Sequence, residues 1–185
     1  MVLVEFVLIV PFLAIMAFGL LEFTVALQRT SSTLDASRAG ARVASSLGND
    51  PTADFYALDS LRSTLSSQGL LPSVTRMVIY QAASPTAPPP STCLAPSPSG
   101  KCDVFTAAQV KTDTAFAFDG TTGCPKAGFG YAGWCPNARI DTQTNADWVG
   151  IWVEVKPSFY TKFFGSIYTI SRSTVMRVEP SPQGA

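Results

Sequence analysis

The first 28 residues constrain the fold of this chain more than any other segment. They contain two charged side chains, Glu5 and Glu22, and the sixteen residues from Phe6 to Leu21 carry none. From Val2 to Leu27 the segment forms an α-helix about 39 Å long, enough to cross a hydrocarbon core of about 30 Å. A core helix of a soluble protein has a polar stripe, whereas this segment is apolar on all sides. The sequence therefore predicts a membrane-spanning helix.

A secretory signal peptide is the alternative interpretation of this segment. Such a peptide has a basic region before a shorter apolar run, and small residues at its cleavage site. Here no Lys or Arg precedes the apolar run, which continues into further helical sequence. The pattern favours a helix that stays in the protein.

The carboxylate of Glu5 follows only four residues of this apolar segment. An unpaired carboxylate in lipid costs several kcal/mol. Two interpretations stay open: a neighbouring positive charge such as an α-amino group neutralises Glu5, or Glu5 is hydrated at the membrane boundary. For Glu22, near the opposite boundary, we expect hydration.

The helical pattern continues to Leu47, and Gly48-Asn49-Asp50-Pro51 ends it. The heptad spacing of Leu27, Leu34 and Ala41 predicts one apolar edge in this second half. The same half is rich in small residues, at Ala36, Ala39, Gly40, Ala41 and Ala44. These either let another element approach closely or serve only as good helix formers.

A second helix and several strands are predicted after the long helix. The helix has Asp50 as its N-cap and Pro51 as its first residue, and it stops at Gly69. Its buried face is predicted to hold Phe55, Leu58, Leu61 and Leu65. The predicted strands are Val74–Gln81, Trp148–Lys156 and Tyr168–Glu179. In the second strand, Val149, Ile151, Val153 and Val155 face one way, and Trp148 and Trp152 face the other.

These elements predict an α+β fold. A long N-terminal helix, membrane-embedded in its lower half, packs on a small antiparallel sheet together with a second helix and disulfide-closed loops. Residues 1–48 form the N-terminal transmembrane helix. Residues 49–185 form the head.

Four cysteines lie in loop-like sequence as two local pairs. Zinc sites favour tighter spacing and often include histidine, which this chain lacks. The disulfides Cys93–Cys102 and Cys124–Cys135 are therefore favoured over free thiols, although four cysteines allow three pairings. Disulfides indicate that the head lies outside the cytoplasm.

Two loops invite a functional interpretation. Residues 84–100 contain six prolines and no charge, which predicts an exposed, extended loop. Between the second pair of cysteines, Phe129, Tyr131 and Trp134 are candidates for a surface contact such as carbohydrate stacking. The alternative is that these aromatics cover a small core.

Composition and motifs argue against several function classes. Thirteen basic and thirteen acidic residues cancel, so there is no electrostatic argument for nucleic acid binding. Without histidine, no Ser-His-Asp or Cys-His arrangement is available, and no phosphate loop or calcium loop is present. We expect no enzyme activity, no metal and no cofactor.

The N-terminal segment resembles the start of a mature type IV pilin. Met1-Val-Leu-Val-Glu5-Phe6 matches that pattern, and the spacing from Glu5 to Pro11 is similar to that of TadE-like pseudopilins of tight-adherence (Flp/Tad) pilus systems. Ala36–Ala44 resembles the stretch that follows their membrane helix, and Ser173–Glu179 resembles their last strand.

This resemblance implies a structural pilus subunit, either a pilin or a minor pseudopilin, that mediates surface adherence. Met1 would bear the free amine, Glu5 would neutralise the amine of an adjacent subunit and set axial register, and Pro11 would weaken the helix. Phe6 belongs to the same assembly segment. The implied partners are other pilin subunits, the inner-membrane assembly machinery and a prepilin peptidase. The protein would reside in the inner membrane before assembly and in a cell-surface pilus afterwards.

A second hypothesis is a surface-anchored binding protein or adhesin that never polymerises. In that case Glu5 is merely hydrated.

Overall fold

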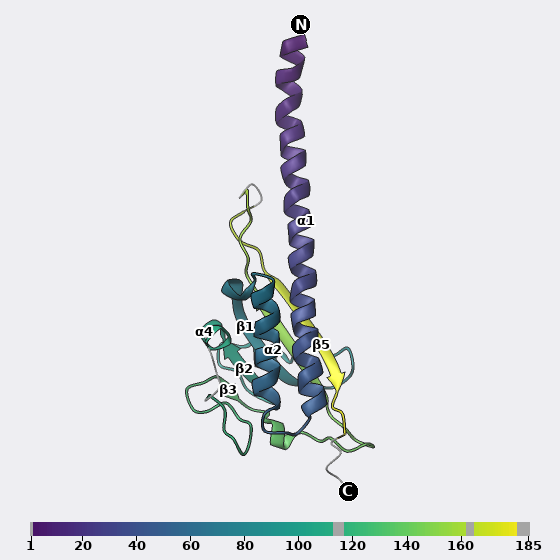
Figure 1. Cartoon of the computed structure of the whole chain (residues 1–185), viewed down its shortest axis with the longest axis vertical. Coiled ribbons are helices and arrows are strands. Elements are labelled where there is room, and N and C mark those ends of the chain that lie inside the picture. The colour runs from purple at the N-terminus through teal and green to yellow at the C-terminus, as the bar shows by residue number, and fades with distance from the viewer. Residues whose placement is uncertain (1, 113–116, 162–164, 181–185) are drawn as a thin grey trace.

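The structure is a computed structural model that describes residues 2–112, 117–161 and 165–180. For residues 2–5 and 7, only the backbone is described. One long helix, α1 (Val2–Leu47), projects far beyond a head that contains a five-stranded antiparallel sheet (Figure 1). The strand order is β3-β2-β1-β4-β5. The predicted α+β fold is confirmed.

The remaining elements follow α1 in the head. They are α2 (Ala53–Ser67), η1 (Leu71–Ser73), β1 (Val74–Ala82), α3 (Ser91–Leu94), β2 (Cys102–Thr106), α4 (Ala107–Lys111), β3 (Tyr131–Ala132), η2 (Pro136–Ala138), β4 (Trp148–Val155) and β5 (Ile170–Arg177).

The second half of α1 lies beside α2 on one face of the sheet (Figure 1). The alternation predicted for β4 is confirmed: its four inward residues are fully buried against the helices, while Trp148 and Trp152 pack on the outer face. On β5, Ile170 and Met176 join the inner core, and the hydroxyl of Thr174 lies 2.8 Å from that of Ser37 on α1.

Small side chains form the face of α1 that the head covers. The buried residues there are Ser32, Thr33, Ala36, Ser37, Gly40, Ala41, Ala44 and Ser45. A Cβ placed on Gly40 would lie 3.0 Å from Cδ1 of Ile151 and 3.1 Å from the carbonyl oxygen of Ala57 on α2. The helices therefore approach too closely for larger residues, which is the first of the two predicted roles for this small-residue stretch.

The predicted apolar edge is wrong in its first half. Leu27 is 52% exposed and Leu34 is only half-buried, whereas Ala41 is fully buried. The covered face is the one that carries small residues, because only these fit against the backbone of α2.

The second helix starts later than predicted. It begins at Ala53 with Thr52 as its N-cap, and the side chain of Asp50 accepts hydrogen bonds from the Thr52 backbone N–H and hydroxyl. Its predicted end at Gly69 is confirmed: Gly69 has a φ of 67°, and the N–H of Leu70 donates to the carbonyl of Leu65. This bonding pattern closes the helix with a Schellman motif.

The outer face of the sheet is covered by the proline-rich loop, held by the disulfide Cys93–Cys102. The Tyr80 hydroxyl donates to the carbonyl of Ala87, and the guanidinium of Arg76 donates to the carbonyls of Leu94 and Ala95. These contacts anchor the loop on the sheet, because the backbone carbonyls of a proline-rich chain can still accept hydrogen bonds. Most residues of the loop are nevertheless exposed, as the sequence predicted. The disulfide Cys124–Cys135 closes the later loop.

A buried group of charged residues connects α2, β2 and the loop after β3. Arg139 donates to Oδ1 of Asp54 and stacks over Trp134, with 4.7 Å from its Cζ to the ring centroid. Oδ1 of Asp103 accepts the backbone N–H groups of Gly133 and Trp134. Within the described part of the chain, Oδ2 of Asp54 and Oδ2 of Asp103 have no hydrogen-bond partner.

Burial raises the pKa of Asp103 to about 8, and the nearby charge of Asp54 adds to the shift. The folded protein therefore holds a proton on Asp103 at neutral pH. A proton on its free Oδ2 lets the group donate to Asp54, which accounts for both unpartnered oxygens.

We predict that Asp103→Asn removes a pH dependence of stability. An unfolded Asp releases its proton near pH 4, whereas the folded one releases it near pH 8, so wild-type stability falls by about 1 kcal/mol per pH unit as pH rises between these values. Asparagine accepts the same two N–H groups and donates to Asp54 without titrating. Thermal unfolding from pH 5 to 8 checks this, with Asp59→Asn, at an exposed position of α2, as the control. An unchanged slope in Asp103→Asn would contradict the assignment.

We also predict that Gly40→Val destabilises the head by about 1–3 kcal/mol, because the larger side chain overlaps Ile151 and the α2 backbone. The loss is measured as a lower thermal midpoint in detergent, by near-UV circular dichroism. Ser31→Val, at an exposed position of the same helix, controls for the β-branched side chain itself. Equal effects of the two substitutions would show that close helix packing does not matter.

Candidate functional site

The N-terminal half of α1 presents large apolar side chains on every side. Those exposed by 40% or more are Phe6, Leu8, Ile9, Val10, Phe12, Leu13, Ile15, Met16, Phe18, Leu20, Leu21 and Phe23. Among the described residues, α1 is the one helix long and apolar enough to cross a membrane. Because this half extends beyond the head, the described part of the chain leaves its apolar surface to lipid or to another molecule (Figure 1).

The predicted assembly residues lie at the far end of this surface. Phe6 is 67% exposed, and Pro11 lies inside α1, where it removes one backbone donor from the helix. Met1 lies outside the described residues, and for Glu5 only the helical backbone is described. The role of Glu5 in register therefore stays a prediction.

A hairpin-like connection between β4 and β5 lies against α1. We call its described residues, 157–161 and 165–168, the arm. Its two sides are joined where the N–H of Phe159 donates to Ser166 and the N–H of Tyr168 donates to Pro157, each at 3.2 Å. The rings of Phe159 and Tyr168 pack with centroids 4.6 Å apart. The arm rises beside α1 beyond the rest of the head, toward the N-terminal end of the helix (Figure 1).

Two charged residues of α1 hold the arm. The carboxylate of Glu22 accepts the backbone N–H of Thr161 and, at 2.8 Å, its hydroxyl. Two helical turns farther toward the C-terminal end of α1, the guanidinium of Arg29 donates to the carbonyl of Ser158 at 2.7 Å. It also stacks on Tyr160, 5.0 Å from the ring centroid. Glu22 and Arg29 are seven positions apart and so lie on one face of the helix.

The expectation that Glu22 is hydrated is therefore wrong. Its side chain is 5% exposed because the arm covers it and supplies two hydrogen bonds to the carboxylate. Two sequence features could have indicated this contact. Glu22 and Arg29 carry opposite charges seven residues apart on one helix face, and an aromatic segment follows the strand Trp148–Lys156.

The proposed aromatic contact surface is only partly present. Trp134 is 3% exposed because Arg139 and the core enclose it, so it cannot touch a surface ligand. Phe129 is half-buried and packs with Phe105 and Phe118, which corresponds to the core-covering alternative. Tyr131 is also half-buried, and its hydroxyl donates to the carbonyl of Gly100.

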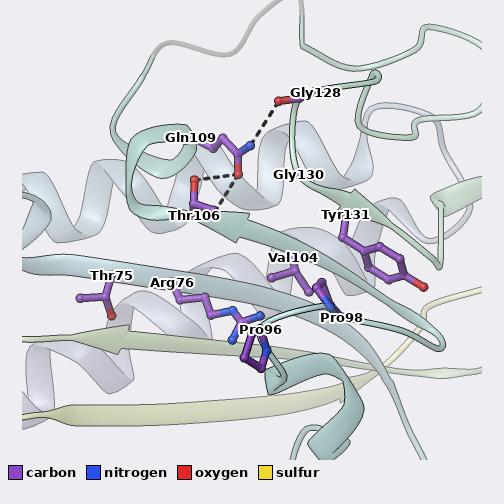
Figure 2. A pocket seen from close by; sticks show the side chains of 10 residues that line it. All are labelled: Thr75, Arg76, Pro96, Pro98, Val104, Thr106, Gln109, Gly128, Gly130 and Tyr131. Carbon is purple, nitrogen blue, oxygen red and sulfur yellow. Dashed lines mark hydrogen bonds between the residues drawn. The ribbon is translucent and has the colours of Figure 1, made fainter.

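Tyr131 lines an open pocket of about 430 Å³ on the outer face of the head (Figure 2). Arg76 and Gln109 point toward this pocket. The Arg76 guanidinium is already bound to two loop carbonyls, and the side-chain oxygen of Gln109 accepts the N–H and hydroxyl of Thr106. The polar groups of the pocket therefore stabilise the head itself and leave no charged group for a ligand.

In the described segments, no group of three or more His, Cys, Asp or Glu residues is placed to hold a metal ion. The most distinctive feature of the described structure is the exposed apolar N-terminal half of α1. The head is fixed to the C-terminal half of the same helix by close packing and by the arm.

Residues 1–42 match the model of a family described as TadE-like protein. The match ends within α1 and does not extend to the last strand, so the resemblance of Ser173–Glu179 stays a prediction. No curated protein and no solved structure matches the chain. The matched residues include the whole exposed apolar half of α1, and this segment is similar to TadE-like proteins, as the sequence predicted.

Proposed function

We propose that this chain is a structural subunit, a pilin or minor pseudopilin, of a Tad-type pilus, assembled through α1. The observation that carries the proposal is an overlap of two features of α1. The TadE-like match covers the half of α1 whose apolar side chains are exposed on all sides. TadE-like proteins are pilus-associated structural components, which supports a structural role rather than catalysis.

The exposed half of α1 suits two environments in turn. Before assembly, lipid surrounds it, since lipid tails accept an apolar helix without a polar stripe. After assembly, helices of other subunits replace the lipid. A helix that is apolar all round fits a bundle interior, whereas a helix covered on one side only would show an exposed polar face.

Glu5 is the residue that would set the register in such a bundle. A carboxylate within apolar surroundings is costly unless a positive charge neutralises it. From residue 2 to residue 28 the chain has no Lys or Arg, so the compensating charge must come from an α-amino group or from another molecule. An amine supplied by the adjacent subunit fulfils this need, and it fixes the axial offset between helices.

The proposal places residues 49–185 outside the cytoplasm as the head, with the subunit in the inner membrane before assembly and in the surface pilus afterwards. The two disulfides of the head support an oxidising location. The implied partners are other pilin subunits, the assembly machinery and a prepilin peptidase. The size of the head favours a minor, priming or capping role over that of the main subunit.

We predict that Glu5→Ala blocks transfer of the chain from membrane to filament. The measurement is the ratio of this chain in sheared filaments to that in membranes, in cells that make the pilus. Glu22→Gln is the matched control, because it removes the other carboxylate of the same helix while the glutamine oxygen still accepts the bonds from Thr161. We expect near wild-type transfer for Glu22→Gln and a loss for Glu5→Ala.

Three wild-type outcomes decide between the roles. A dominant share of sheared material identifies the main pilin, and traces there, with fibres lost on deletion, identify a priming or capping subunit. Retention in the membrane with fibres still formed overturns the proposal and leaves an anchored binding protein.

A further inference from the structure

The arm contacts α1 at the level where the apolar segment ends. Glu22, which Thr161 holds, is the first charged residue after the uncharged run Phe6–Leu21. Glu5 and Glu22 are about 26 Å apart along the helix axis, close to the about 30 Å of a hydrocarbon core. Arg29, the second contact, lies about 10 Å farther along.

The membrane–water interface therefore falls on the arm. A bilayer is about 40–45 Å thick with its headgroups, which leaves about 5–8 Å of interface on each side of the hydrocarbon core. The guanidinium of Arg29 cannot lie in the hydrocarbon core without a large cost, so the core ends below it. The segment of α1 between Glu22 and Arg29, with the arm against it, spans this interface.

The arm also carries the most exposed large apolar side chains of the head. Outside α1, those exposed among the described residues are Tyr56 at 49%, Ile140 at 44%, Tyr160 at 72% and Ile167 at 61%. The two highest values are both on the arm. Exposed apolar side chains are costly in water, but Tyr in particular is favoured at headgroup level, where its ring is in an apolar layer and its hydroxyl is hydrated.

Contacts with α1 fix the position of the arm along the helix axis. Two backbone hydrogen bonds and the packing of Phe159 on Tyr168 hold the two sides of the arm together. Contacts from Ser158, Tyr160 and Thr161 fix the arm to α1. The height of Tyr160 and Ile167 above the hydrocarbon core is therefore set by α1 itself.

We propose that the arm is a membrane-interface anchor, which inserts Tyr160 and Ile167 into the lipid headgroup layer on the side where the head emerges. This inference rests on the membrane insertion of α1 in the proposed function, not on assembly. The anchor gives the head a second point of attachment beside the helix, so that the head stands in one orientation on the membrane before a subunit is extracted.

The test uses the full chain in lipid nanodiscs and tryptophan emission. Three variants each add one tryptophan: Tyr160→Trp on the arm, Leu13→Trp in the apolar half of α1, and Tyr56→Trp at the far end of the head, beside Leu47. Emission is compared with that of the wild type, whose three tryptophans lie in the head. Nitroxide-labelled lipids quench at headgroup depth or at mid-chain depth.

We expect headgroup nitroxide to remove most of the emission added by Tyr160→Trp, and to leave that of Tyr56→Trp unchanged. Mid-chain nitroxide should quench Leu13→Trp most strongly. If Leu13→Trp is quenched while Tyr160→Trp behaves like Tyr56→Trp, only the anchor is overturned. If Leu13→Trp escapes quenching, α1 is not in the membrane, and both the anchor and the membrane part of the proposed function fail. Ile167→Trp repeats the test without altering the contact between Arg29 and Tyr160.

Discussion

Close packing of the small-residue face of α1 against α2 and β4 is the contact on which the rest of the molecule depends. Gly40 lets Ile151 and the α2 backbone come within van der Waals distance, and the alanines and serines beside it extend the same smooth face. Because that packing occupies only the second half of α1, the first half is left without cover from the head. One continuous helix thus serves two environments, with the change from small to large apolar side chains marking the boundary between them.

The arm binds α1 near the boundary between its apolar half and its small-residue half. Its backbone and hydroxyl bonds satisfy Glu22, the charged residue nearest to the apolar half, and its carbonyl at Ser158 receives the guanidinium of Arg29. A helix that would otherwise be free to tilt against the head is therefore held at two places, by the core and by the arm. Such a rigid connection suits a subunit in which the helix transmits the position of the head to its neighbours.

The sequence predicted what local patterns determine. The alternation in β4 and the end of α1 at Gly48 follow from neighbouring residues, and both were predicted. The contacts of Glu22 with Thr161, 139 residues away, and of Asp54 with Arg139, 85 residues away, have no local pattern and were missed. For Trp134 the sequence allowed two interpretations, a surface contact or the cover of a small core, and the position of Arg139 over its ring decides for the second. The small-residue stretch of α1 allowed two interpretations, and only the position of α2 separates them.

In the proposed assembly, the apolar half of α1 exchanges lipid for the helices of other subunits. A photo-activatable residue in place of Phe12, which is 63% exposed within that half, tests it directly in cells that make the pilus. We expect a cross-link to the N-terminal helix of another pilus subunit, recovered in the sheared filaments. Cross-links to lipid alone, with all of the chain retained in the membrane, would contradict it.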